Sequence, residues 1–144
     1  YYSLGRGNRF FKAKAEGDIA EDGCDTRIAC TRLTLIRELT NYDIAKEAML
    51  YMLHHPQRNG WQKSGHMLCV AEQTADIKIP DGIAIARGSS PRVSGYIGAH
   101  LGLIKEQDGK IIAAKLFTVD GENILPGTWY TLDTLAEAER RQQA

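Results

Sequence analysis

The sequence has few cysteines and prolines, no net charge and no long apolar run. Its 144 residues include three cysteines, and 18 basic side chains balance 18 acidic ones. An odd, sparse set of cysteines is not a disulfide framework, and zero net charge removes long-range attraction to nucleic acids or anionic membranes. No stretch approaches the ~20 apolar residues that span a bilayer, and the start does not resemble a signal peptide. We therefore expect a cytoplasmic protein with free thiols and no membrane contact; a Cys24–Cys30 bridge is the alternative in an oxidising compartment.

The residues that are present have the composition of an ordinary globular domain. Apolar residues make up 43% of the chain and charged residues 25%, which argues against disorder. A typical domain has about 100–200 residues, so we predict a single domain over residues 1–144. The sequence begins at Tyr1 without a methionine, as a domain cut from a larger protein or a processed chain would, and we favour the first.

The first half of the chain shows a short strand pattern and then helix patterns. Apolar and basic residues alternate over residues 11–15, and this period of two indicates a half-buried strand. Residues 26–39 fit both a strand and a helix, and we favour a helix for their second half. Thr40 and Asp43 form a capping pattern ahead of a helix over 41–55, which Pro56 ends. These patterns predict a mostly helical N-terminal half.

The second half has the texture of a β-sheet. About five apolar segments lie between residues 66 and 132, separated by turn signals such as Pro80-Asp81-Gly82 and Gln107-Asp108-Gly109. Strands joined by tight turns pair antiparallel. Thr134 and Glu137 then form a capping box for a helix over 135–143. We predict an α+β fold in which the helical N-terminal half packs on an antiparallel β-meander of about five strands, with a short C-terminal helix.

The histidines and cysteines do not form a metal-binding pattern. His54 and His55 are adjacent, and neighbours on a helix diverge by about 100°. No C-x-x-C, H-x-x-x-H or H-E-x-x-H spacing occurs, whereas a zinc site takes three or four protein ligands. We expect no metal and no cofactor.

A cysteine-dependent hydrolase or transferase is one functional hypothesis. Such enzymes place a cysteine at a helix N-terminus, where the dipole favours the thiolate, and a histidine serves as its base. Cys24 or Cys30 precedes a candidate helix, and His66 opens a strand that could present it as the base. A second arrangement combines Cys69, His100 and Asp120. The competing interpretation is that these cysteines are small buried hydrophobic residues.

Nucleic-acid contact is a second hypothesis, and it rests on the N-terminal segment. Aromatic side chains are interleaved there with basic ones, a combination that suits phosphate contacts and base stacking. The basic candidates in this segment are Arg6, Arg9, Lys12 and Lys14, and Arg87 and Arg92 extend the patch if the fold gathers them. The competing interpretation is a solvated terminal strand whose aromatic residues enter the core.

The hypothesis we favour is a non-catalytic binding or accessory module of a larger protein or assembly. The polar residues of the β half are spread over turns and converge on no recognisable site. The expected partner is another protein or domain, with nucleic-acid contacts through the basic N-terminal segment as a further expectation. A module of this kind should expose an apolar patch of a few hundred Å². The Cys/His enzyme is the alternative.

Overall fold

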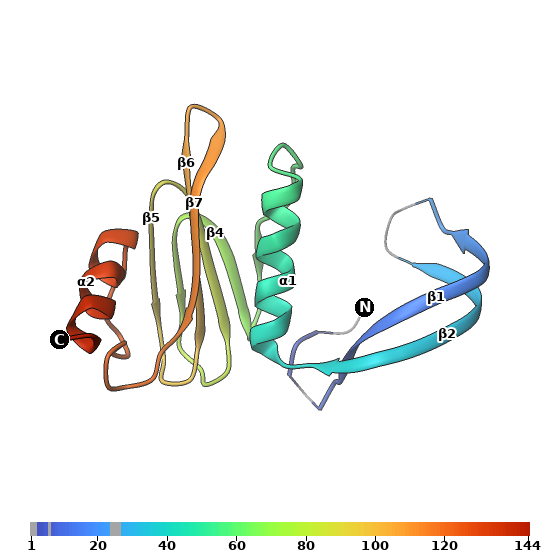
Figure 1. The fold of residues 1–144 in the computed structure, drawn as a ribbon, viewed down its shortest axis with the longest axis horizontal. Helices are drawn as coiled ribbons and strands as arrows, with labels where there is room; N and C mark the ends of the chain where they lie inside the picture. The colour runs from blue at the N-terminus through green and yellow to red at the C-terminus, as the bar shows by residue number, and fades with distance from the viewer. Residues whose placement is uncertain (1–2, 6, 24–26) are drawn as a thin grey trace.

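The structure is a computed structural model that describes residues 3–5, 7–23 and 27–144. It contains a two-stranded hairpin, one helix, a five-stranded mixed sheet and a C-terminal helix (Figure 1). In chain order the elements are β1 (Phe10–Glu21), β2 (Ile28–Leu39), α1 (Asn41–His54), β3 (Lys63–Ser64), β4 (Leu68–Ile77), β5 (Ile83–Gly95), β6 (His100–Gln107), β7 (Lys110–Thr118) and α2 (Leu132–Gln142).

The N-terminal segment is a β-hairpin, so the prediction of a mostly helical first half was wrong. β1 and β2 pair antiparallel along nearly their whole length. The strand predicted over residues 11–15 extends from Phe10 to Glu21, and the Thr and Ile residues of β2 favour a strand over the helix that apolar spacing suggested. The helix after Thr40 is confirmed as α1, and its capping box is complete because Thr40 and Asp43 each accept from the other's backbone N–H.

The sheet has the order β3-β4-β5-β6-β7, and the predicted antiparallel meander was wrong at its centre. β4, β5 and β6 run parallel, whereas β3 and β7 pair antiparallel with their neighbours. Leu68, Ile83 and His100 are register partners, so successive strands start 15 (68 to 83) and 17 (83 to 100) residues apart. Pro80-Asp81-Gly82 is a turn as predicted, but it returns the chain to the start of the next parallel strand.

The parallel pairing requires β4 and β5 to bend. A straight ten-residue strand is about 33 Å long, and residues 78–82 could span only about 20 Å of it. Gln73 has a positive φ of 61°, and Gly88 lies where an added Cβ would be 2.6 Å from the Gln73 side chain. Each strand therefore doubles back near these residues, and the chain forms a flattened coil (Figure 1).

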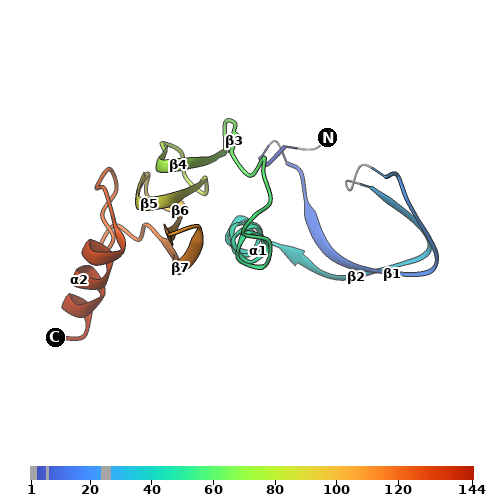
Figure 2. The same cartoon turned by 90° about the horizontal axis from the view of Figure 1, so that it is seen from above.

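The core has two layers, one inside the coil and one between the coil and α1. Ala84 and Ala86 of β5 point into the coil, whereas Ile83 and Ile85 alternate with them and pack on α1. The interior is narrow and takes many small residues. On the other side, a Cβ on Gly102 would be 2.7 Å from Met49 Sδ, which shows how closely α1 approaches the sheet. Figure 2 shows α1 beside the coil on the side from which the hairpin projects.

The C-terminal helix is confirmed, although α2 begins at Leu132 and is capped by Thr131 with Thr134. The predicted pairing of Thr134 with Glu137 is replaced because the helix begins three residues earlier. Leu135 and Ala138 anchor α2 in the interior core. Tyr130 forms a single bridge to Val93 where a further strand was expected. Among the described residues, no helix has the length and hydrophobicity needed to cross a membrane.

Candidate functional site

The hairpin of β1 and β2, called the arm below, projects from the body beside α1 (Figures 1 and 2). Because directly opposed residues share a face of a β-ladder, its register separates two faces. The charged face carries Lys12, Lys14, Glu16, Arg32, Thr34 and Arg37. The apolar face carries Phe11, Ala13, Ala15, Leu33 and Leu35, with Glu38 opposite Phe11 at its end nearest the body. The arm is therefore amphipathic, as a strand that covers a core would be.

The apolar face of the arm remains exposed to solvent among the residues that the structure describes. Leu33 is 60% exposed, Leu35 58% and Phe11 36%. Beside them Ile36, the extra residue of a β-bulge, is also exposed. Single exposed apolar side chains are common on proteins, but a continuous apolar face on a two-stranded sheet marks an interaction surface. An isolated hairpin is also marginally stable in water unless a further layer supports it.

Charge is distributed unevenly along the arm. The half nearest the body, residues 10–15 and 34–39, has three basic residues and one acid, a net charge of +2. The outer half, residues 16–21 and 28–33, has three acids and one basic residue, a net charge of −2. The arm is thus an electric dipole along its length, positive at the base and negative towards the tip.

The edges of the arm are poorly suited to pairing with further strands. The ladder is interrupted between Lys12 and Ala13 and again between Glu16 and Ile19. At the second interruption the backbone N–H of Asp18 donates to Thr31 Oγ1 at 2.8 Å, next to Gly17 with its positive φ of 83°. Bulges and lysines along an edge oppose the addition of strands. Contact through the apolar face is therefore favoured over contact through an edge.

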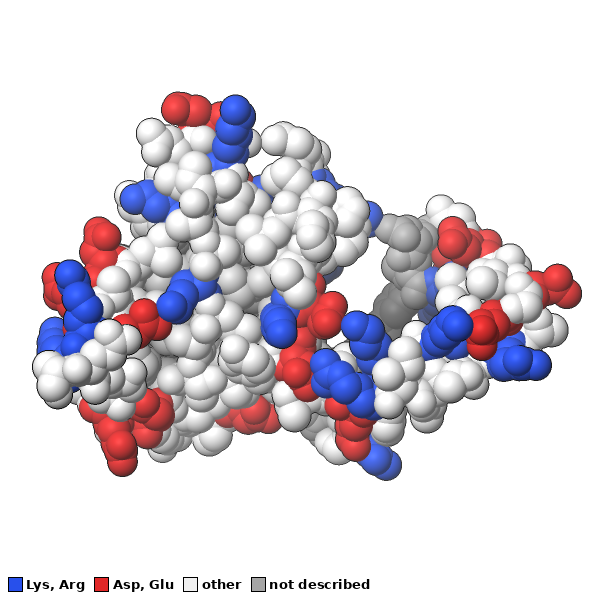
Figure 3. Space-filling model, in the orientation of Figure 1, with Lys and Arg blue, Asp and Glu red and all other residues white. Residues whose placement is uncertain are grey.

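The structure does not gather the basic residues proposed to contact nucleic acid. Arg9 forms a two-pronged ion pair with Glu38, and this hydrogen bonding holds the pKa of Glu38 below its usual value. Lys12 and Lys14 lie on the charged face of the arm with Glu16. Arg6 lies outside the described residues. On the face seen in Figure 3, basic and acidic side chains are interspersed on the arm and no continuous basic surface is visible.

Arg87 and Arg92 do not extend a basic patch. Arg87 is 4% exposed and donates from Nε and Nη2 to Glu106 Oε1, at 2.8 and 2.6 Å. Arg92 lies over the Trp129 ring, 4.9 Å from its centroid, and donates to Thr74. Trp129 precedes α2, which lies at the end of the molecule opposite the arm (Figure 1). The two arginines therefore have structural partners of their own.

The cysteines and histidines proposed for catalysis lie in separate places. Cys30 is in β2 opposite Ile19 and does not precede a helix. His66 lies in the exposed loop between β3 and β4. Among the described residues, neither Cys30 nor Cys69 makes a hydrogen bond to a histidine, and Cys24 lies outside them.

Cys69 and His100 point to opposite sides of the sheet. Cys69 packs against the coil interior, as does its register partner Ala84. His100 is in register with Ile83, which faces α1, and its ring meets Tyr42 of that helix edge-on at 5.6 Å. Asp120 uses its carboxylate to accept three backbone N–H bonds in its own loop. The second proposed triad is therefore not assembled.

His100 instead joins three segments at the first turn of α1. Its Nε2 lies 2.7 Å from Asp81 Oδ1, and its Nδ1 lies 2.9 Å from Thr118 Oγ1. Asn41 Nδ2 also donates to Asp81, at its backbone oxygen and at Oδ2. These bonds fix the start of the helix to the turn after β4. Across the described ranges, no group of three or more metal-ligating side chains occurs.

The comparisons with known proteins single out the same N-terminal region. Residues 1–47 are similar to a family model described as "Domain of unknown function (DUF7666)". This match spans the arm and the first half of α1. Searches of curated proteins and of solved structures found no match. The alternation of apolar and polar residues in β1 was the sequence signal for the amphipathic arm, but the exposure of its apolar face appears only in the structure.

Proposed function

We propose that this chain is a non-catalytic assembly module whose arm binds a second copy of the chain through its apolar face. The observation that carries the proposal is the exposure of Leu33 and Leu35 on a face with the alternation of a buried strand. Burying a leucine side chain is worth about 1.5–3 kcal/mol. Two such faces packed together supply to each arm the layer that its own chain does not provide.

The charge dipole of the arm supports a second copy as the partner. When two identical arms pack face to face about a two-fold axis across them, they run in opposite directions. The base of one arm, at +2, then lies over the outer half of the other, at −2. Packed sheets lie about 10 Å apart and most of these charges are on the outward faces of the two arms, so the charges fix orientation more than affinity. A parallel arrangement would set like charges together.

Sedimentation of the purified chain over a range of concentrations tests this proposal. We expect the mass to rise from 16.0 kDa toward twice that value. Leu35→Glu should weaken the dimer by about 2–3 kcal/mol over both copies, or roughly a hundredfold in Kd. Thr34→Glu, on the charged face of the same strand, is the matched control and should leave most of the affinity intact.

A charge reversal tests the orientation. Lys12→Glu with Lys14→Glu makes the base negative and should weaken association. Adding Glu16→Lys and Asp18→Lys inverts the dipole of the whole arm. This fourfold variant should associate again, because the two halves of the arm are again complementary in charge. A wild-type chain that stays monomeric at every concentration would refute the proposal, as would equal effects of Leu35→Glu and Thr34→Glu.

A further inference from the structure

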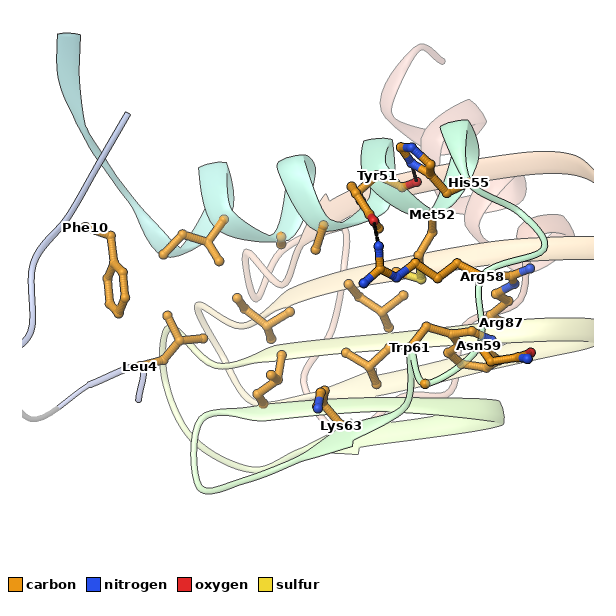
Figure 4. A pocket seen from close by; sticks show the side chains of 18 residues that line it. Leu4, Phe10, Tyr51, Met52, His55, Arg58, Asn59, Trp61, Lys63 and Arg87 are labelled. Atoms are coloured by element: carbon orange, nitrogen blue, oxygen red, sulfur yellow. Dashed lines mark hydrogen bonds between the residues drawn. The ribbon is translucent and has the colours of Figure 1, made fainter. Parts of the chain in front are cut away.

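A second feature, independent of the arm's apolar face, is a cavity between α1 and the sheet (Figure 4). Its volume is about 430 Å³, within the range of about 300–1,000 Å³ that small-molecule sites occupy. It is lined by α1, which contributes Met52, and by strand residues that face the helix, among them Val70, Ile83 and Ile85. The segment after α1, which carries Trp61, closes one side.

The cavity is apolar at one end and cationic at the other. Figure 4 shows Leu4 and Phe10 at one end of it, and Arg58 and Arg87 together at the opposite end. Lys63 of β3 lies along the wall between them. None of the 18 described lining residues is an aspartate or a glutamate. This arrangement complements a molecule that has an apolar body and a single negative end.

Arg87 places a buried guanidinium, ion-paired with Glu106, in the wall of this end of the cavity. Nε and Nη2 are occupied by Glu106 and by the carbonyl of Pro56. Nη1 is buried without a hydrogen-bond partner in the described part of the chain. The indole of Trp61 lies over the guanidinium, 5.0 Å from ring centroid to Cζ. A donor left unmet in this way costs about 1–3 kcal/mol, so an acceptor brought near it is favoured.

Arg58 forms the other half of the cationic end. Its Nη1 donates to the hydroxyl of Tyr51 on α1, as the dashed line in Figure 4 shows. The Tyr51 ring in turn stacks on His55 at a centroid distance of 4.2 Å. These contacts hold the Arg58 guanidinium at this end of the cavity. A planar guanidinium matches the two oxygens of a carboxylate, which favours this anion over a compact charge of other shape.

We propose that this cavity binds a small monocarboxylic acid with an aliphatic body. The hydrocarbon lies over Met52, Ile83 and Ile85 toward Phe10. The carboxylate lies at Arg58, beside the Arg87 guanidinium whose Nη1 has no hydrogen-bond partner among the described residues. The apolar floor supplies affinity, at about 0.8 kcal/mol for each CH₂ group buried. The basic side chains make the cavity select a carboxylate over a neutral end group.

Calorimetric titration with octanoate, octanol and acetate tests this assignment. Octanoate should bind one to one, octanol at least about tenfold more weakly, and acetate not measurably. Arg58→Gln should remove the preference for octanoate over octanol and leave octanol affinity unchanged. Lys105→Gln, which alters a cation outside this cavity, is the control and should keep the preference.

A second variant tests the location. Ala48→Phe, on the helix lining of the cavity, should abolish binding of both eight-carbon ligands in a chain whose unfolding transition remains cooperative. The Leu35→Glu variant should bind octanoate like the wild type. Loss of octanoate binding can therefore be distinguished from loss of self-association. Equal affinity for octanoate and octanol would overturn the proposal. Absence of octanoate binding, or binding unaffected by Ala48→Phe, would do the same.

Discussion

The ion pair of Arg87 with Glu106 predicts an asymmetric response to mutation. Arg87 is 4% exposed, whereas the Glu106 side chain is 27% exposed. Glu106→Gln leaves a buried guanidinium without its counter-charge, and breaking a buried pair in this way costs about 3–5 kcal/mol. The glutamine oxygen still accepts one hydrogen bond, so we expect a loss of about 3 kcal/mol in the free energy of unfolding.

The reverse substitution should be milder. Arg87→Met removes the buried charge and keeps much of the side-chain volume, while Glu106 retains access to water. The hydrogen bond to the Pro56 carbonyl is lost, so we expect a cost of about 1–2 kcal/mol. The double variant should resemble Arg87→Met alone, because the glutamine no longer faces an uncompensated charge.

Urea unfolding of the four chains measures these differences directly. In thermal unfolding, a chain near this size loses about 2–4 °C in Tm for each kcal/mol, so Glu106→Gln should lower Tm by roughly 6–12 °C. Glu139→Gln, which breaks the exposed pair with Lys115, is the control and should change the unfolding free energy by about 0.5 kcal/mol or less. If Glu106→Gln costs no more than this control, or less than Arg87→Met, the reasoning about burial is wrong.

Two further predictions concern stability. Asp120 accepts the backbone N–H bonds of Ile124, Glu122 and Asn123, and these bonds lower its pKa. Its contribution is therefore present above the unfolded-state pKa of about 3.9 and is lost as the pH falls through the lower folded-state value. Asp120→Asn should flatten the dependence of the urea midpoint on acid pH, and an unchanged pH profile would contradict this. Gly102→Ala brings a methyl group against Met49 and should cost about 1–3 kcal/mol, with partial recovery in a Met49→Ala background; equal losses in both backgrounds would reject this contact.

The helix caps were predictable because they depend on neighbours in sequence. Thr40 and Asp43 meet within one turn, and Pro56 prevents the helix from continuing, so α1 was located to within one residue at its end. The turn at Asp81-Gly82 was predictable for the same reason, because it depends on residues adjacent in sequence. The helix predicted within residues 26–39 failed because its strand state depends on pairing with β1, whose partner residues lie between 7 (21 to 28) and 29 (10 to 39) positions earlier along the chain.

The sheet topology depended on contacts that no local pattern encodes. A tight turn usually joins antiparallel strands, but the bends near Gln73 and Gly88 let the chain return and pair in parallel. The positive φ of Gln73 is held by side-chain bonds to Ser89 and Ser90 of the next strand. The sequence around Gln73 does not predict this bend, because the residues that hold it lie in the next turn of the coil.

The sequence by itself determined the α+β class, the capped helix and the amphipathic alternation of the arm, because propensity, capping and period are properties of near neighbours. Tertiary structure alone decided that Arg87 is buried while Leu33 and Leu35 are exposed. Burial depends on which elements meet in space, and it reverses what residue type suggests at these positions. The candidate sites follow from those reversals: an apolar face with no cover, and a charge inside the wall of an apolar cavity.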